Sequence, residues 1–165
     1  MIFLTVGTIL PFDRLVRAVD EAVGRGLIQD KVFAQIGKTK AIPRHFESAD
    51  VLDKDTFGAK INQASSIISH AGMASITMAL THNKPLLVMP RLKRYGEHVN
   101  DHQLGTAKKF EELGCVVVAY TEDELPEKVR QLETFVPKKR TAVPEAVARR
   151  IADFLGVLAK ENQRR

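Results

Sequence analysis

The chain has 165 residues, of which 44% are hydrophobic and 27% charged, and its formal net charge is +5. This length is one ordinary domain, and the composition is that of a globular protein rather than a disordered or fibrous one. The longest apolar stretch, residues 85–90, is far shorter than the roughly 20 residues of a membrane-spanning helix. A transferase that closes two domains around two substrates needs about 150 residues for each, so this length accounts for only one of them.

The N-terminus and the cysteine content indicate a cellular compartment. Residues 1–6 lack the basic segment of a signal peptide, and Cys115 is the single cysteine. We therefore expect no internal disulfide and a cytoplasmic, reducing environment, with Cys115 as a buried, inert thiol.

Six short apolar runs alternate with segments of helical spacing. The expected strands are residues 2–6, 32–36, 49–52, 66–69, 86–89 and 116–119. Nearly continuous apolar strands are typical of a parallel sheet covered on both faces. The sequence therefore predicts an α/β fold, an open, doubly wound, mostly parallel six-stranded sheet with helices on both faces.

Each of the first two strands ends in a glycine loop. Gly7 and Thr8 follow the first strand, and Gly37 follows the second. Neither loop carries the G-x-G-x-x-G fingerprint of dinucleotide-binding proteins or a Walker A lysine motif. At the carboxyl edge of a parallel sheet these loops lie where ligands bind.

The fourth strand runs directly into a small-residue turn and a helix. His70, Ala71 and Gly72 form the turn, and the helix begins near Met73. Glycine lets a ligand approach the backbone closely, and the free N–H groups of residues 73–75 attract phosphate, helped by the helix dipole. Three loops at one edge can surround a diphosphate; simple strand-to-helix punctuation is the alternative.

The segment after the fifth strand is rich in hydrogen-bonding side chains. A basic loop, residues 90–94, precedes Gly96-Glu97-His98-Val99-Asn100-Asp101-His102-Gln103. Neighbouring carboxylate and amide groups suit sugar hydroxyls. His98 and His102 are four residues apart, so on a helix they would share one face, and a metal site with Glu97 or Asp101 is a rival interpretation. A surface helix without any ligand is another.

The whole net charge lies at the C-terminus. Residues 137–165 contain eight basic and three acidic side chains, while residues 1–136 contain 17 of each. The body therefore lacks the basic stripe of a nucleic-acid-binding surface, and we expect no nucleic-acid partner. We expect two regions, an α/β domain over residues 1–140 and an amphipathic basic helix and tail over residues 141–165. The helix from Pro144 to about Lys160 packs on the sheet, or docks a partner or an anionic membrane surface.

Taken together, these motifs resemble the C-terminal, donor-binding domain of the family 28 glycosyltransferases, which have the GT-B architecture. The resemblance covers about residues 1–135. It is closest to the soluble subunits of split enzymes, namely bacterial exopolysaccharide and capsule glycosyltransferases and the eukaryotic dolichol-linked N-acetylglucosaminyltransferase. The matching motifs, in order, are Val6-Gly7-Thr8 with Phe12-Asp13, Gln35-Ile36-Gly37, Ser69-His70-Ala71-Gly72-Met73, Pro90-Arg91, and Gly96-Glu97-His98 through Asp101-His102-Gln103.

The resemblance implies an inverting, metal-independent glycosyltransferase subunit with no cofactor. It would move a sugar from a UDP-sugar to a lipid-linked sugar acceptor in exopolysaccharide or capsule synthesis. A membrane-anchored partner subunit would supply the acceptor-binding half, which places the chain at the inner face of the membrane. A non-catalytic nucleotide-binding or regulatory module is the alternative.

The resemblance also implies residue roles. Asp101, His102 and Gln103 would hold the donor sugar, and the catalytic base would lie on the partner, with His98 and His102 as minor candidates. Many relatives carry a ribose-binding glutamate where this chain has Met78, so ribose recognition must come from elsewhere or be weaker. The diphosphate would lie among Gly7, Thr8, Gly37, His70, Ala71, Gly72, Met73 and Ser75.

Overall fold

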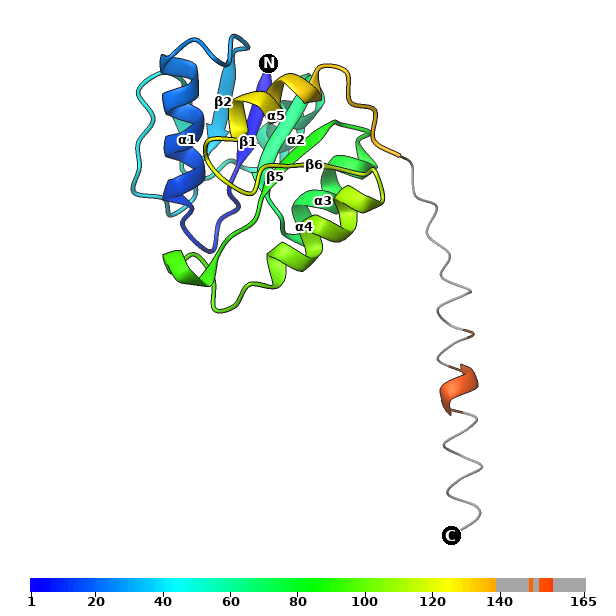
Figure 1. Ribbon diagram of the computed structural model, residues 1–165. Helices are drawn as coiled ribbons and strands as arrows, with labels where there is room; N and C mark the ends of the chain where they lie inside the picture. Colours follow the sequence, from blue (N-terminus) through cyan, green and yellow to red (C-terminus); the bar gives the residue numbers. More distant parts are fainter. Residues whose placement is uncertain (139–148, 150–151, 156–165) are drawn as a thin grey trace, which may run out of the picture.

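The computed structural model describes residues 1–138, 149 and 152–155 (Figure 1). All five strand pairs in the six-stranded sheet are parallel, and the strand order is β3-β2-β1-β4-β5-β6. The expected doubly wound α/β fold is confirmed. The strands are β1 (Ile2–Thr5), β2 (Val32–Gln35), β3 (Glu47–Ala49), β4 (Ser66–His70), β5 (Leu86–Met89) and β6 (Val117–Val118).

The helices cover both faces of the sheet (Figure 1). One core lies between the sheet and the helices α1 (Asp13–Gly24) and α5 (Leu125–Leu132). The other lies between the sheet and the helices α2 (Lys54–Gln63), α3 (Met73–Thr81) and α4 (His102–Glu112). Strand residues alternate between the cores, because successive side chains point to opposite faces: Leu4 belongs to the first core and Phe3 to the second.

The third strand differs from its expected position. The apolar run at residues 49–52 predicted a strand there, but β3 is Glu47–Ala49, and Val51 is 62% exposed. Among the described strands, β3 lies at the edge of the sheet and pairs with β2 alone. An edge strand is defined by this pairing and not by burial on both faces, so polar residues serve as well as apolar ones. Beyond Ala49 the chain turns toward Asp53, which caps α2 by accepting hydrogen bonds from the N–H groups of Asp55 and Thr56.

The connection between β2 and β3 contains no helix and runs along α1 instead. The Asp13 carboxylate accepts hydrogen bonds from the N–H groups of Lys40 (3.1 Å) and Ala41 (2.8 Å). Asp20, two turns further along α1, accepts from the N–H groups of Arg44 (2.9 Å) and His45 (2.8 Å). Because side chains seven residues apart lie on the same helix face, these two carboxylates hold the connection parallel to the helix.

The C-terminal expectations fall mostly outside the described residues. The boundary at residues 140 and 141 and most of the helix expected from Pro144 to Lys160 lie there. Arg149 and residues 152–155 are helical, with Phe154 and Leu155 exposed.

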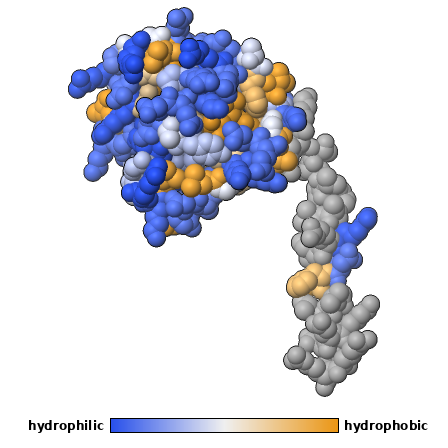
Figure 2. All heavy atoms as spheres, viewed as in Figure 1, coloured by the Kyte–Doolittle hydropathy of each residue, from blue (hydrophilic) through white to orange (hydrophobic). Residues whose placement is uncertain are grey.

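Over the described part of the chain, no helix is both long and apolar enough to cross a membrane. The molecular face in Figure 2 is largely hydrophilic, with scattered apolar side chains.

Candidate functional site

The predicted diphosphate loops meet where the strand order reverses. β1 lies between β2 and β4. From β2 the chain continues outward to β3 on one side of β1, and from β4 it continues outward to β5 and β6 on the other side. Open α/β sheets bind ligands in the crevice beyond the carboxyl ends of strands at such a switch point. The loops after β1, β2 and β4 carry Gly7, Gly37 and Gly72, so their order along this edge follows directly from the topology.

Close backbone approach brings these loops together. Gly37 has a φ of +56°, and a Cβ on it would overlap the carbonyl oxygen of Gly7. A Cβ on Gly7 would lie 3.4 Å from His70 Nε2, and one on Gly72 would overlap the His70 ring. The structure therefore places four of the predicted residues in one cluster. Thr8 is exposed beside Gly7, and Ala71 is buried behind the turn.

Hydrogen bonds fix the His70 ring inside this cluster. Its Nε2 lies 3.2 Å from Ser75 Oγ, which is 3.0 Å from Ser69 Oγ. Ser69 Oγ in turn donates to the carbonyl of Thr5 at 2.6 Å and so connects β4 to β1. Burial, together with the nearby charges of Arg91 and His98, lowers the pKa of His70 to about 4. His70 is therefore neutral at pH 7.

The N-terminus of α3 faces this cluster. Its N-cap is Gly72, and no side chain caps the helix. The first-turn N–H groups of Met73, Ala74 and Ser75 are thus left without a capping acceptor, in the arrangement that favours phosphate. Met73 is 54% exposed, so the first turn is open to solvent. Met78, five residues further along α3, is partly buried against the second core.

The predicted sugar-binding residues share a loop but differ in their surroundings. Gln103 is only 3% exposed, and its Oε1 accepts a hydrogen bond from the Arg91 N–H at 3.1 Å. Asp101 is exposed, and its Oδ1 accepts from the Lys93 N–H at 2.7 Å. Both residues therefore hold the segment after β5 in place. His102 is exposed at the start of α4.

The expectation that His98 and His102 share a helix face is wrong. Gly96 has a φ of +69°, Asp101 is the N-cap of α4, and His98 lies in the loop before the helix. The two rings still meet edge to face, with centroids 4.5 Å apart. Burial and the charges of His102 and Arg91 lower the pKa of His98. Within the described part of the chain, no three His, Cys, Asp or Glu side chains gather as metal ligands would.

Sequence reasoning missed two arginines beside the site, Arg91, which is buried, and Arg14, which is nearly buried. Arg91 is 4% exposed, and its Nη2 donates to the carbonyls of Val6 and Leu10. Arg14 on α1 forms a two-fold ion pair with Glu97, with N–O distances of 2.8 and 3.0 Å. The sequence around Arg91 does suggest burial, because the apolar residues of β5 precede it and Leu92 follows it. The contact between Arg14 and Glu97 spans 83 residues and has no local signature.

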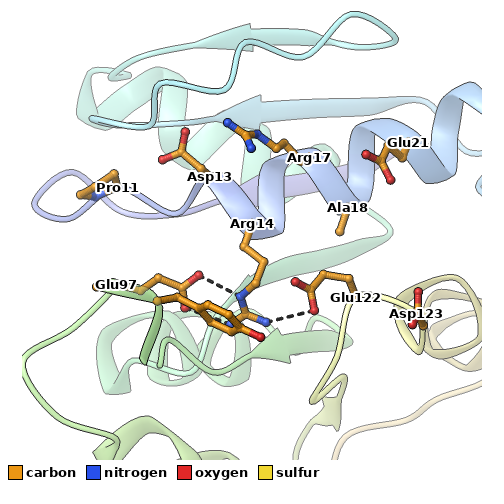
Figure 3. Close-up of a pocket in the computed structure, with 11 residues that line it drawn as sticks. Pro11, Asp13, Arg14, Arg17, Ala18, Glu21, Glu97, Glu122 and Asp123 are labelled. Carbon is orange, nitrogen blue, oxygen red and sulfur yellow. Dashed lines mark hydrogen bonds and ion pairs between the residues drawn. The ribbon is translucent and has the colours of Figure 1, made fainter. Parts of the chain in front are cut away.

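A cavity of about 710 Å³ lies next to the Arg14–Glu97 pair (Figure 3). Arg14 extends from α1 toward Glu97 on one side and Glu122 on the other. None of the predicted diphosphate- or sugar-binding residues lines this cavity. Its lining holds more carboxylates than guanidinium groups, which disfavours an anionic ligand. The lining consists of Pro11, Asp13, Arg14, Arg17, Ala18, Glu21, Tyr95, Gly96, Glu97, Glu122 and Asp123.

Comparison with known families identifies this arrangement. The model of the glycosyltransferase family 28 C-terminal domain matches residues 1–155. The chain belongs to this family. The family 28 domain therefore spans the whole six-stranded sheet and all the loops described above.

Individual relatives support the same assignment. The human protein named UDP-N-acetylglucosamine transferase subunit ALG13 is 33% identical over 122 residues, which are 68% of this chain and 10% of that protein. The mouse protein of the same name is 32% identical over 124 residues, again 10% of its length. The present chain thus matches about a tenth of each of these relatives.

Solved structures share the fold of this family 28 domain at low sequence identity. The solution structure of ALG13 has a TM-score of 0.58 and 22% identity, and the match covers 90% of this chain and 92% of that one. MurG from Acinetobacter baumannii has a TM-score of 0.53 and 21% identity over 80% of this chain but only 40% of its own. The kitacinnamycin glycotransferase, with a TM-score of 0.57 and 22% identity, is covered over 34% of its length.

Proposed function

We propose that this chain is the donor-binding subunit of a two-component, inverting glycosyltransferase that uses a UDP-sugar. The observation that carries the proposal is the cluster at the switch point. There the uncapped N-terminus of α3 follows directly on His70, whose ring lies against Gly7 and Gly72, and Gly7 in turn lies against Gly37. Arg91 binds the carbonyl next to Gly7, and the charges of Arg91 and His98 both act on His70. Membership of family 28 and the name of the ALG13 relatives support this activity.

A diphosphate fits this cluster on electrostatic grounds. The α3 N-terminus offers unpaired N–H groups and the positive end of the helix dipole. Arg91 adds a full positive charge, and His70 adds a ring nitrogen in the same place. In the proposed mechanism an acceptor hydroxyl displaces UDP at the anomeric carbon with inversion, and these fixed groups stabilise the departing diphosphate. They do so without a metal ion or another cofactor.

The donor sugar would lie beyond the diphosphate, against the loop after β5. Asp101, His102 and Gln103 are proposed to bind its hydroxyl groups. Asp101 has a second carboxylate oxygen beyond the one that holds Lys93, and Gln103 has an amide nitrogen beyond the oxygen that holds Arg91. Each side chain can therefore hold the loop with one atom and offer another atom to the sugar.

We propose that a membrane-anchored partner supplies the acceptor-binding half. The ALG13 relatives are named as subunits. The chain matches nearly all of the ALG13 solution structure but only 34% to 40% of the kitacinnamycin glycotransferase and MurG. The acceptor is then a lipid-linked sugar of exopolysaccharide or capsule synthesis, presented at the inner face of the membrane. The partner also provides the general base; His98 and His102 serve only if it does not.

Reconstitution tests this proposal. Transfer of radiolabelled sugar from UDP-sugars to lipid extract is measured for the chain alone, for the chain with the membrane-anchored product of the adjacent reading frame, and for that product alone. Transfer that requires both proteins is the expected result. Full transfer by the chain alone would exclude the two-component arrangement. UDP binding without transfer in any mixture would favour the alternative, a non-catalytic nucleotide-binding module, to which the missing acidic residue at Met78 also points.

A further inference from the structure

Two buried nitrogen atoms beside the proposed diphosphate site have no hydrogen-bond partner. They are His70 Nδ1 and Arg91 Nε, and they are the only buried side-chain nitrogen or oxygen atoms without a partner among the residues that the structure describes. Leaving a buried polar atom unpaired costs about 1–3 kcal/mol. The two residues lie against the same loop, since Arg91 donates to the Val6 carbonyl at 2.7 Å and a Cβ on the next residue, Gly7, would lie 3.4 Å from His70 Nε2. Both unpaired atoms therefore belong to one place in the fold.

Arg91 is a buried cation without an acidic partner. Its side chain is 4% exposed, and no ion pair forms at its guanidinium in the described part of the molecule. Burial lowers the pKa of Arg91 to about 10, and the more distant charge of Glu97 only partly offsets this effect. Placing a charge inside a protein without a partner of opposite sign is costly. The burial of Arg91 is therefore better explained by a role in binding a negatively charged ligand than by its contribution to stability.

Arg14 shows what a compensated arginine looks like in the same fold. Its side chain is 9% exposed, Glu97 binds it through two nitrogen–oxygen contacts, and Glu122 lies 3.5 Å away. Although burial lowers the pKa of Arg14, the hydrogen bond and charge of Glu97 raise it above the ordinary value. Among the described residues, two carboxylates contact Arg14, whereas none contacts Arg91.

The contacts of Arg91 connect it to the diphosphate loop. Its Nη2 donates to the carbonyl of Val6 at 2.7 Å and to that of Leu10 at 2.8 Å, and its guanidinium lies 5.0 Å from the centre of the Phe12 ring. Val6 and Leu10 lie on either side of Gly7 and Thr8 in the sequence, so the two hydrogen bonds hold both ends of this segment. A neutral amide could donate to the same two carbonyls, so the loop alone does not require a charge.

We propose that Arg91 is a positioning residue for the diphosphate of the nucleotide-sugar. It orders the loop between β1 and α1, and beside His70 it supplies the positive charge that the bound diphosphate neutralises. This inference rests on the proposed function, and it adds a residue to which neither the motifs nor the comparisons assign a role. The charge acts across a buried site, where a unit charge is screened less than in water.

Binding of UDP and of uridine to the full chain separates this role from a purely structural one. Arg91→Gln keeps hydrogen-bond donors for the carbonyls but removes the charge. We expect it to weaken UDP binding at least about 10-fold and to change uridine binding less than about 2-fold, because only UDP carries the diphosphate. The matched control is Arg94→Gln, which removes a charge from the exposed side of the same loop and should leave both affinities nearly unchanged.

A second variant and a second readout complete the test. Arg91→Lys keeps the charge and should retain UDP binding within about 3-fold, which decides the question if Arg91→Gln does not fold. By NMR titration, Arg91→Gln should also raise the pKa of His70, which a neutral structural contact would not do. Unchanged UDP binding in Arg91→Gln, or equal losses of UDP and uridine in either Arg91 variant, would overturn the role of Arg91. Failure of the unmodified chain to bind UDP would instead contradict the proposed function.

Discussion

Arg14 and Glu97 join the first helix to the loop after the fifth strand through a nearly buried, two-fold ion pair. Glu97 also accepts a hydrogen bond from the Leu92 N–H at 2.9 Å, and Arg14 donates to the Pro90 carbonyl at 2.8 Å. One carboxylate therefore fixes both the start of this loop and the position of α1.

Breaking this pair should destabilise the protein strongly. Glu97→Gln removes the closer of the two carboxylates at the nearly buried Arg14 guanidinium and leaves only Glu122, at 3.5 Å, and we expect a loss of about 3 kcal/mol in the free energy of unfolding. The exposed pair Lys109–Glu112 is the control, where Glu112→Gln should cost about 0.5 kcal/mol or less. Urea denaturation of the three proteins measures both. Similar losses in the two variants would show that the Arg14 pair is no better shielded from solvent than a surface pair.

The close approach of Gly37 to Gly7 can be tested with a matched glycine. Gly37→Ala and Gly26→Ala both place a side chain at a positive φ, of +56° and +70°, but only at Gly37 would the new Cβ overlap a backbone atom. The strain of the backbone conformation is common to both variants. Gly37→Ala should therefore be less stable than Gly26→Ala by about 1–3 kcal/mol, and it alone should weaken UDP binding. Equal stability of the two variants would mean that the loops move apart at little cost.

The lowered pKa of His70 predicts a dependence of stability on pH. The unfolded chain protonates this histidine near pH 6.5, whereas in the folded state its pKa is about 4. Between these values the unfolded state binds more protons, so this group's contribution is present above pH 6.5 and is lost as the pH falls toward 4. The loss amounts to about 3 kcal/mol. His70→Gln should lose less stability than the unmodified chain between pH 7 and pH 4.5 in urea denaturation.

Both proteins contain the same carboxylates, so the difference between their two losses of stability reports the contribution of His70. An identical loss of stability in the two proteins would mean that His70 titrates alike in the folded and unfolded states.

Two substitutions of Gln103 separate its structural role from its proposed role in binding. Gln103→Leu leaves the buried Arg91 N–H without an acceptor and should cost about 1–3 kcal/mol of stability. Gln103→Glu keeps an acceptor oxygen for this N–H, so it should retain the hydrogen bond that Gln103→Leu loses. It replaces the amide nitrogen with an acceptor near the donor site, and UDP-sugar binding should weaken more than UDP binding. Calorimetry measures both affinities, and equal changes would place the sugar away from Gln103.

The switch-point cluster could be predicted from the sequence because its signals are local. The strands β1, β2 and β4 each run into a loop that contains a glycine, and parallel strands bring those ends to one edge of the sheet. This reasoning located Gly7, Gly37, His70 and Gly72 correctly beside one another.

Other features depend on contacts that no local pattern encodes. The position of the edge strand β3 is determined by its pairing with β2. His98 lies outside the expected helix because Gly96 adopts a left-handed conformation and turns the chain there. The burial of Arg91 depends on carbonyls more than 80 residues away in sequence. Charged residues are expected on the surface by default, so buried ones are the features that sequence patterns miss.

The hydrogen bonds that Asp13 and Asp20 accept from the connection between β2 and β3 have a consequence for the dynamics of the domain. Four amide protons of this connection are held by helix side chains and not by a neighbouring strand. They should therefore resist exchange with solvent only while α1 is formed, and they should open together with that helix. Exchange at residues 40–45 would then report the integrity of α1, and with it the position of the Arg14–Glu97 ion pair, although the segment itself is neither helix nor strand.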